Sequence, residues 1–407
     1  MSCLLISNAA KLPEDTVRAF ADEVAYIGGD PLYWVRREAS FAVGALAKVV
    51  PIEVALLSLL PLFENLARDT VWQVRHSAVF ALPGILTRLT PQHRRTLALN
   101  ILIPLSGDVA PTVRSGVLEV LGEVIYAFHE DSGGAPPELV SMFVGREQDL
   151  EWCQRTCSTE PLESGPSTSK AKTPLGALSS VFENDDDSPE ESEAEQPELV
   201  GPSPAVTTAP GDFFRDPTRS LITSFNYPAV ALSLGPRRWS EVREHYLTLA
   251  QDKNLRVRRT IAASLGEMAR ILGSELALRD LVDVWQDMVH DADDGQTRLK
   301  ALGGVCLFVG ALEGSAREPI VMGLGELWEK WLIGWREREC LTQALPTLAA
   351  MAEGQGEVVR TLMGKGLVDK IAAVREAAVG AVRSFLLLFI TRLMRDFLVV
   401  DSPLSCI

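Results

Sequence analysis

The side chains that could carry catalysis or bind a metal are thinly spread through this chain of 407 residues. A metal-dependent phosphoester hydrolase clusters His, Asp and Asn ligands in motifs such as Gly-Asp-x-His-Gly or Gly-Asn-His-Glu, and the sequence contains neither. Nucleotide loops and the Gly-x-Ser-x-Gly nucleophile elbow are also missing. The five histidines have no Cys or His at ligand spacing: His76, His93, His129, His245 and His290. We therefore expect a protein that is not an enzyme and that uses no cofactor and no metal.

The six cysteines are dispersed, which favours reduced thiols over a disulfide framework. Cys153 and Cys157 do not form a Cys-x-x-Cys pair, so no zinc site is expected there. Residues 1–13 lack the charged region and the cleavage site of a secretory signal. These features indicate a cytoplasmic or nuclear location, or both.

The net charge of −15 argues against nucleic acid and against anionic membranes as partners, because both are bound through clustered Lys and Arg. The most apolar stretch, residues 385–400, is interrupted by Arg392, Arg395 and Asp396. Its Leu and Phe residues recur at helical spacing, which favours an amphipathic helix over a membrane span. We expect neither a nucleic-acid partner nor a membrane partner.

The charged residues that do recur follow a repeat. Asp30, Asp69 and Asp108 lie 39 residues apart, and a Val-Arg pair begins five residues after each of them. The same interval follows Asp252 and Asp369. A period of about forty residues is typical of a helical solenoid, whose units bury their apolar faces only by stacking. Apolar residues at i, i+3, i+4 and i+7 predict two helices per unit. The expected fold is therefore all-α, a superhelix of antiparallel helix pairs.

Two kinds of side chain in the repeat could face a partner. Trp34 and Trp72 precede the Val-Arg pair in successive turns, where they either pack over the neighbouring turn or form a partner-binding ridge. The arginines either pair with the turn Asp of the next repeat, as a structural ladder, or contact the partner directly. The candidate ridge comprises Trp34, Trp72, Arg36, Arg75 and Arg114.

Residues 151–222 break the pattern. They carry 14 acidic and 5 basic residues and are rich in Ser and Pro, so they cannot bury enough apolar area to offset the entropy of ordering. A disordered acidic linker is predicted. Several of its hydroxyl residues precede Pro or lie three positions before an acid, which is typical of kinase sites, although a plain solvated linker would also contain such pairs. The candidates are Thr173, Ser180, Ser188, Ser192 and Ser203.

Helical periodicity resumes after this segment. The predicted organisation is a repeat block over residues 1–150, the linker over 151–222, a second repeat block over 223–400 and a tail over 401–407.

The turn Asp, the Val-Arg pair and the apolar second helix resemble HEAT repeats. Residues 224–273, with "YPAVALSLG", Trp239, "YLTLAQD" and "VRRTIA", resemble the later repeats of the HEAT-repeat regulatory subunits of protein phosphatase 4. Residues 59–82, "LLPLFENLARDTVWQVRHSAVFAL", resemble the earlier repeats of that family. The chain is expected to be a short or partial homologue.

The resemblance implies a non-catalytic scaffold that binds a Ser/Thr phosphatase catalytic subunit and directs it to phosphoprotein substrates, with the catalytic metals on the partner. Two alternatives stay open. A karyopherin-like transport adaptor would share the solenoid and an acidic loop, and a scaffold of the protein phosphatase 2A type would share the repeats.

Overall fold

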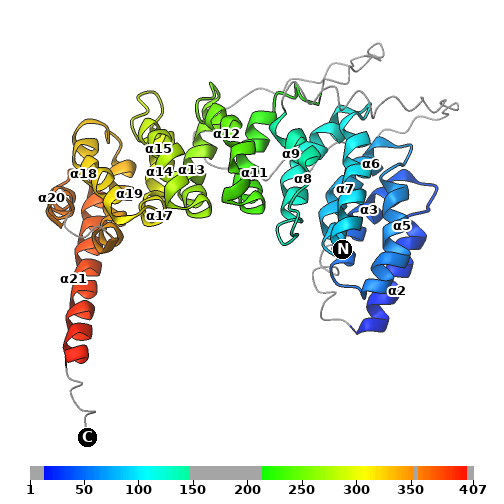
Figure 1. Cartoon of the computed structure of the whole chain (residues 1–407), viewed down its shortest axis with the longest axis horizontal. Helices are drawn as coiled ribbons and strands as arrows, with labels where there is room; N and C mark the ends of the chain where they lie inside the picture. The colour runs from blue at the N-terminus through cyan, green and yellow to red at the C-terminus, as the bar shows by residue number, and fades with distance from the viewer. Residues whose placement is uncertain (1–12, 146–212, 352–355, 401–407) are drawn as a thin grey trace, which may run out of the picture.

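The computed structural model describes residues 13–145, 213–351 and 356–400, and within these ranges all regular structure is helical. The helices form successive antiparallel pairs that stack into an arch, with the first and last pairs at opposite ends (Figure 1). The predicted all-α HEAT solenoid is confirmed.

Each repeat contributes one helix to an outer layer and one to an inner layer, and is named below after its inner helix. The inner helices are α3 (Tyr33–Ala47), α6 (Trp72–Leu86), α8 (Pro111–Tyr126), α11 (Arg219–Leu234), α13 (Leu255–Leu272), α16 (Gly295–Gly303) with α17 (Val305–Ala311), α19 (Trp335–Met351) and α21 (Ala372–Val400). The outer helices are α2 (Glu14–Ile27), α4 (Ile52–Val54) with η2 (Ala55–Leu59) and α5 (Leu60–Leu66), α7 (Pro91–Ser106), α9 (Pro137–Val144), η4 (Pro236–Glu241) with α12 (Arg243–Ala250), α14 (Ser274–Asp280) with α15 (Val282–Val289), α18 (Gly314–Lys330) and α20 (Gly356–Leu367).

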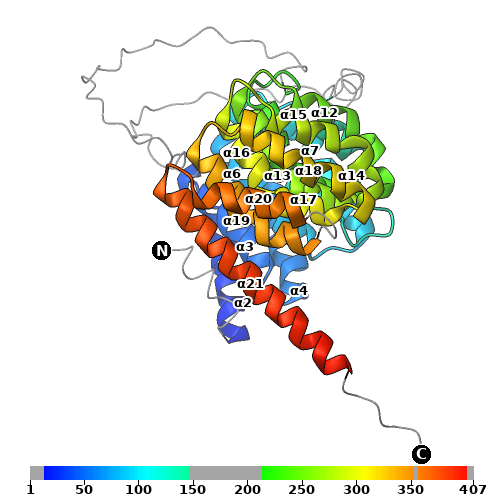
Figure 2. The same cartoon turned by 90° about the vertical axis from the view of Figure 1, so that its left-hand side faces the viewer.

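The two layers are visible in part when the molecule is viewed along the stack. In Figure 2, α3, α6 and α19 lie towards one side, and α12, α14 and α15 lie towards the other. Neighbouring inner helices contact each other more extensively than neighbouring outer helices do. The inner layer is therefore the shorter, concave side of the arch.

Helix α13 illustrates why the sequence forms these helices. Asn254 caps its first turn by accepting a hydrogen bond from the N–H of Arg256. Val257, Ile261 and Leu265 follow at four-residue spacing and are buried. Burying one such side chain contributes about 1.5–3 kcal/mol, so stacking stabilises each helix far more than its intrinsic propensity does.

The insertion lies inside one repeat rather than between two blocks. Outer helix α9 ends at Val144 and its inner partner α11 begins at Arg219, so the intervening residues replace the short turn of the other repeats. Helix α11 packs directly against α8. The stack of inner helices is therefore continuous across the insertion.

Arg219 joins the two ends of the insertion. Its guanidinium donates hydrogen bonds to the carbonyls of Met142 and Phe143, at the end of α9. It also lies over the rings of Phe213 and Phe214, 5.2 and 5.3 Å from their centroids. Gly145 ends α9 with φ +67°, where an added Cβ would lie 2.4 Å from the Arg219 Nε atom. A side chain at residue 145 would displace this contact.

The predicted linker ends earlier than its composition suggested. Phe213 is completely buried, and residues 219–222 form the first turn of α11, although all of them fall within the predicted linker. Composition averages over a window, so it did not separate these apolar residues from the acidic stretch before them. The remainder of the linker, with its five candidate phosphorylation sites and Cys153 and Cys157, lies outside the described residues, as does the tail.

Glycines allow the inner helices to approach closely. A Cβ on Gly84 of α6 would lie 2.3 Å from the carbonyl oxygen of Gly44 on α3, and a Cβ on Gly266 of α13 would lie 2.7 Å from the carbonyl oxygen of Gly304. Both obstacles are backbone atoms, which cannot move aside as a flexible side chain can. Small residues at these crossings thus allow the tight inner spacing that curves the arch.

We expect Gly84→Ala to lower the free energy of unfolding by about 1–3 kcal/mol, because the α3–α6 crossing must open. The matched control is Gly303→Ala, since a Cβ there meets no atom within 4 Å and alanine favours a helix by up to about 1 kcal/mol. Urea unfolding followed by circular dichroism measures both. Equal stability of the two variants would contradict the close crossing.

Candidate partner-binding surface

The turn between the two helices of a repeat is built around its Asp. In the α6 repeat, Asp69 Oδ1 accepts a 2.8 Å hydrogen bond from the N–H of Val71, and Asp108 does the same for Ala110 in the next repeat. A carboxylate that binds the N–H two residues ahead closes the turn before the helix begins. The recurring Asp is therefore explained first by local turn chemistry.

The recurring Arg joins that turn to the next repeat. Arg75 donates to Asp108 through Nε and a terminal nitrogen, at 2.7 and 2.8 Å. Its remaining nitrogen donates to the carbonyls of Asp69 and Thr70 in its own turn, at 2.7 and 3.2 Å. Arg36 binds Asp69 and its own turn in the same way. Each guanidinium therefore fixes two successive turns at once.

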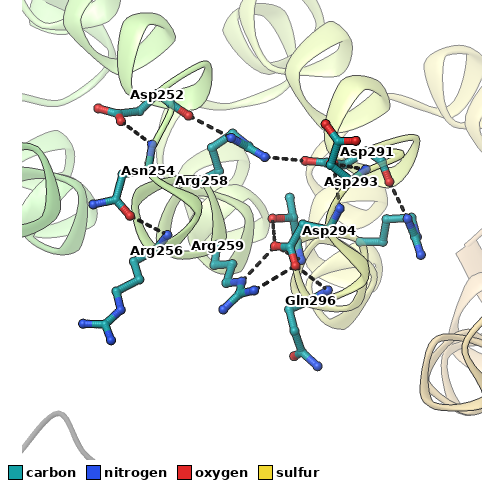
Figure 3. Close-up of polar contacts among 11 residues, drawn as sticks. Asp252, Asn254, Arg256, Arg258, Arg259, Asp291, Asp293, Asp294 and Gln296 are labelled. Atoms are coloured by element: carbon teal, nitrogen blue, oxygen red, sulfur yellow. Dashed lines mark hydrogen bonds and ion pairs between the residues drawn. The ribbon is translucent and has the colours of Figure 1, made fainter.

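The ladder continues through the later repeats, as Figure 3 shows for α13 and α16. Arg258 donates to the carbonyl of Asp252 and, at 3.2 Å, to the carboxylate of Asp291. A second rung runs beside it, where Arg259 binds Asp294 through two 2.8 Å hydrogen bonds. Asp294 also caps α16 by accepting from the backbone. Two parallel rungs thus connect these repeats.

The α19 repeat has no turn Asp, and Glu337 takes its place. Its carboxylate accepts a 3.0 Å hydrogen bond from the N–H of Gly334 and pairs with Arg298 at 2.8 Å. Arg338 then binds Asp369 at 2.7 Å. The sequence pattern missed Glu337 and Arg338, because a longer side chain reaches the turn from inside the helix. Arg338 lies forty positions after Arg298, and this spacing is the one signal that could have identified it.

The sequence allows the arginines of the candidate ridge either to form a structural ladder between repeats or to contact a partner directly. Their geometry supports the ladder. Arg36 and Arg75 direct their nitrogens to turn carbonyls and to the next Asp. Arg114 is buried and donates to the carbonyls of Asp108 and Val109. These side chains shape the turn edge from within, which leaves the tryptophans as its exposed part.

The ladder lowers the pKa values of its carboxyl groups. Burial alone would raise the pKa of Asp69, but hydrogen bonds from Arg36 and from the N–H of Val71 outweigh burial, so the pKa is lowered. Asp369 behaves in the same way under the influence of Arg338. For Asp294, the hydrogen bond from Arg259 is the largest effect and lowers the pKa. The ladder is therefore at full strength when these groups are ionised.

Trp34 and Trp72 are exposed at the starts of α3 and α6, with 53% and 40% of their surfaces accessible. Trp72 is the first member of a row on α6, in which its ring contacts His76, and the ring of His76 meets Phe80 edge-on at 5.1 Å. On α3, Phe41 is exposed two turns after Trp34. We call these five side chains the aromatic face.

The sequence interpretation found the two tryptophans but missed Phe41, His76 and Phe80. The i, i+4, i+8 spacing along α6 was the available signal. His76 lies over Gly116 of α8, where a Cβ would be 3.0 Å from its Cδ2 atom. Burial lowers the pKa of His76, which favours the neutral form of its imidazole.

Neither metal nor membrane chemistry is visible in the part of the chain that the structure describes. No three His, Cys, Asp or Glu side chains gather there as a metal would require. Among the same residues, no helix has the length and apolar character that crossing a bilayer demands.

The fold and its turns define a HEAT-repeat solenoid, and comparison with known proteins agrees. A HEAT-repeat family matches residues 59–89. The structure is similar to importin β, with a TM-score of 0.58 and 15% identity over 91% of this chain and 44% of that chain. It is also similar to a chain in a complex of Kap95p with RanGDP, with a TM-score of 0.50 and 14% identity over 95% of this chain and 41% of that one. At these identities the likeness shows the fold alone.

Within that class, the chain is similar to protein phosphatase 4 regulatory subunit 1, as its motifs predicted. Residues 223–327 match the family described as the middle domain of that protein. The human, mouse and rat proteins named serine/threonine-protein phosphatase 4 regulatory subunit 1 are each 32% identical over 155 residues. This match covers 37% of the chain but 16% of each relative.

The residues that carried this resemblance in the sequence are core residues. Tyr227 is buried and donates a 2.7 Å hydrogen bond to the carbonyl of Val242. Trp239 is buried against Tyr246 and donates to Asp280 at 2.9 Å. Burial would raise the pKa of Asp280, but hydrogen bonds from two arginines and Trp239 lower it to about 2. In this chain, the motifs that carried the resemblance therefore pack η4, α11 and α12 together.

We expect Arg75→Lys to lower the free energy of unfolding by about 2 kcal/mol, because an ammonium group cannot reproduce the fork that binds Asp108 and two carbonyls. The matched control is Arg95→Lys, whose pair with Glu138 is more exposed and should cost less than about 0.5 kcal/mol. Urea midpoints measure both variants. Equal midpoints would show that the fork contributes little.

Stability should fall in acid. Asp69 has a lower pKa folded than unfolded, so its contribution is fully present above the unfolded value of about 3.9 and is lost as the pH falls through the folded value. Asp69→Asn should therefore be less stable than the wild type at pH 7, and the difference should narrow as the pH falls below about 4. Thermal melts across this range test it. A difference that stays constant with pH would contradict the assignment.

Proposed function

We propose that this chain is a non-catalytic regulatory scaffold, which binds a Ser/Thr phosphatase catalytic subunit of the protein phosphatase 4 type and directs it to phosphoprotein substrates. The observation that carries the proposal is the match of residues 223–327 to the middle domain of protein phosphatase 4 regulatory subunit 1. We propose that the chain has this role in the cytoplasm or the nucleus.

The architecture supports a scaffold role. The inner helices stack without a break across the insertion, and the Arg-Asp rungs fix each turn against the next. A chain held in this way presents a long surface of defined curvature, on which two partners can be kept at a set distance. In this proposal the metals and the hydrolytic chemistry belong to the bound catalytic subunit.

We place the contact with the catalytic subunit at Trp34 and Trp72. Both are large exposed aromatic side chains on neighbouring repeats, and the rungs below them hold their turns in register. Tryptophan is enriched among the residues that dominate binding energy in protein interfaces. The acidic insertion occupies the sequence position of a turn, between α9 and α11. We propose that its Ser and Thr sites regulate the complex when phosphorylated.

The test is capture of a purified phosphatase 4 catalytic subunit by the tagged full chain. We expect Trp34→Ala with Trp72→Ala to weaken binding by about tenfold or more. The matched control changes two exposed apolar residues of the outer layer, Tyr26→Ala with Leu57→Ala, each 79% accessible. Phosphopeptide hydrolysis should appear only with the catalytic subunit present.

Three outcomes would overturn parts of this proposal. Absence of capture removes the phosphatase role, and recovery of nuclear-transport factors from cell extract in its place would favour the karyopherin-like alternative. Capture that the tryptophan variants leave unchanged would place the contact elsewhere on the chain. Phosphate release by the chain alone would contradict a non-catalytic role.

A further inference from the structure

The aromatic face is an apolar surface on the concave side of the arch that no described residue covers. Trp34, Phe41, Trp72 and Phe80 are each at least 37% accessible, and His76 connects the last two through ring contacts. Isolated apolar residues are common on protein surfaces, but large aromatic side chains exposed on two inner helices that pack against each other, α3 and α6, indicate an interaction site. The neighbouring charges indicate which partner fits.

Two carboxylates border this face on the next inner helix. Glu119 and Glu123 are exposed on α8, one turn apart, and neither forms an ion pair with the residues that the structure describes. Gly116, one turn before Glu119, is the residue over which His76 and Phe80 lie. Residues three and four apart share a helix face, so Glu119 follows directly along the border of the aromatic face.

These carboxylates differ from those of the ladder. Asp69 and Asp108 each receive a guanidinium from the preceding repeat, whereas Glu119 has Asp216 as its charged neighbour. Although Glu119 is exposed, its carboxyl group is partly shielded by its neighbours; this partial burial raises its pKa, and the charge of Asp216 raises it further. A cation supplied from outside would compensate this charge, as the arginines do within the ladder.

We propose that the aromatic face, with Glu119 and Glu123, binds a partner segment in which apolar side chains alternate with Lys or Arg. The apolar side chains pack on Trp72 and Phe80, and the basic ones reach the two glutamates. An Arg or Lys stem also covers aromatic surface while its charge stays at the carboxylate. This inference deepens the proposed function, because it names the chemistry of the segment that docks beside Trp34 and Trp72. The role of that partner rests on the proposed function.

The binding itself can be measured with the full chain and no phosphatase. The probe is a fluorescein-labelled amphipathic helix of Leu and Lys, compared by fluorescence anisotropy with a helix in which Glu replaces each Lys. We expect the Leu/Lys probe to bind more tightly by about tenfold or more at low ionic strength. Trp72→Ala with Phe80→Ala should weaken it by a similar factor.

A charge-matched control separates this site from the general acidity of the chain. Glu119→Gln with Glu123→Gln should weaken the Leu/Lys probe by about fivefold or more. Glu244→Gln with Glu357→Gln removes the same two charges from exposed positions of the outer layer and should leave affinity unchanged. Thermal melts confirm that all three double variants fold.

The outcomes are separable from those of the proposed function. Equal binding of the Leu/Lys and Leu/Glu probes, or equal effects of the two glutamine pairs, would overturn the site. Suppose that the wild-type chain does not bind the Leu/Lys probe preferentially, but that the catalytic subunit is still captured by the Glu119→Gln, Glu123→Gln chain. That result would overturn this inference and leave the proposed function standing.

Discussion

One guanidinium, shared between two turns, is the contact on which the rest of this solenoid depends. Arg75 satisfies two carbonyls of its own turn and the carboxylate of the next, while that carboxylate satisfies a backbone N–H two residues ahead. Turn closure and repeat stacking are therefore one network rather than two. Partly buried ion pairs of this kind cost desolvation energy, so their main contribution is to fix register and rotation between repeats.

The inner layer of helices forms the concave surface that a partner can contact. Glycine crossings such as Gly44 with Gly84 bring the inner helices together, and the resulting curvature turns their remaining faces towards one concave side. In the first two repeats those faces carry large aromatic side chains, and in the third they carry Glu119 and Glu123. A surface of mixed character thus arises from residues on three successive inner helices, α3, α6 and α8.

The similarity to protein phosphatase 4 regulatory subunit 1 and the candidate surface involve different parts of the chain. The matched family covers residues 223–327, in which Tyr227 and Trp239 are buried packing residues. The aromatic face lies in the α3 and α6 repeats, upstream of that segment. Relatedness therefore supports the architecture and the proposed role, whereas the binding surface depends on the exposure and charge of these earlier repeats.

Much of the fold could be predicted because its rules act over short distances. The interval from Asp69 to the following Val-Arg pair reflects one turn and the first turn of one helix. Spacing therefore identified the repeat and the regular ladder residues, and it singled out Trp34 and Trp72, whose exposure it left open. The acidic composition of the insertion was equally visible, but its end was misplaced. Phe213 is buried against Arg219, and Arg219 binds carbonyls of α9, which lie on the other side of the insertion in the sequence.

What the sequence by itself determined was the repeating unit: two helices, a capped turn, and an Arg ready to reach the next carboxylate. The tertiary structure alone decided that Glu337 replaces a missing turn Asp, that the insertion divides the α11 repeat, and that His76, Phe80 and Glu119 lie along one surface. Glu337 meets Arg298 about forty residues before it, and Arg219 meets the end of α9 across the whole insertion. Such contacts exist only after the helices have stacked.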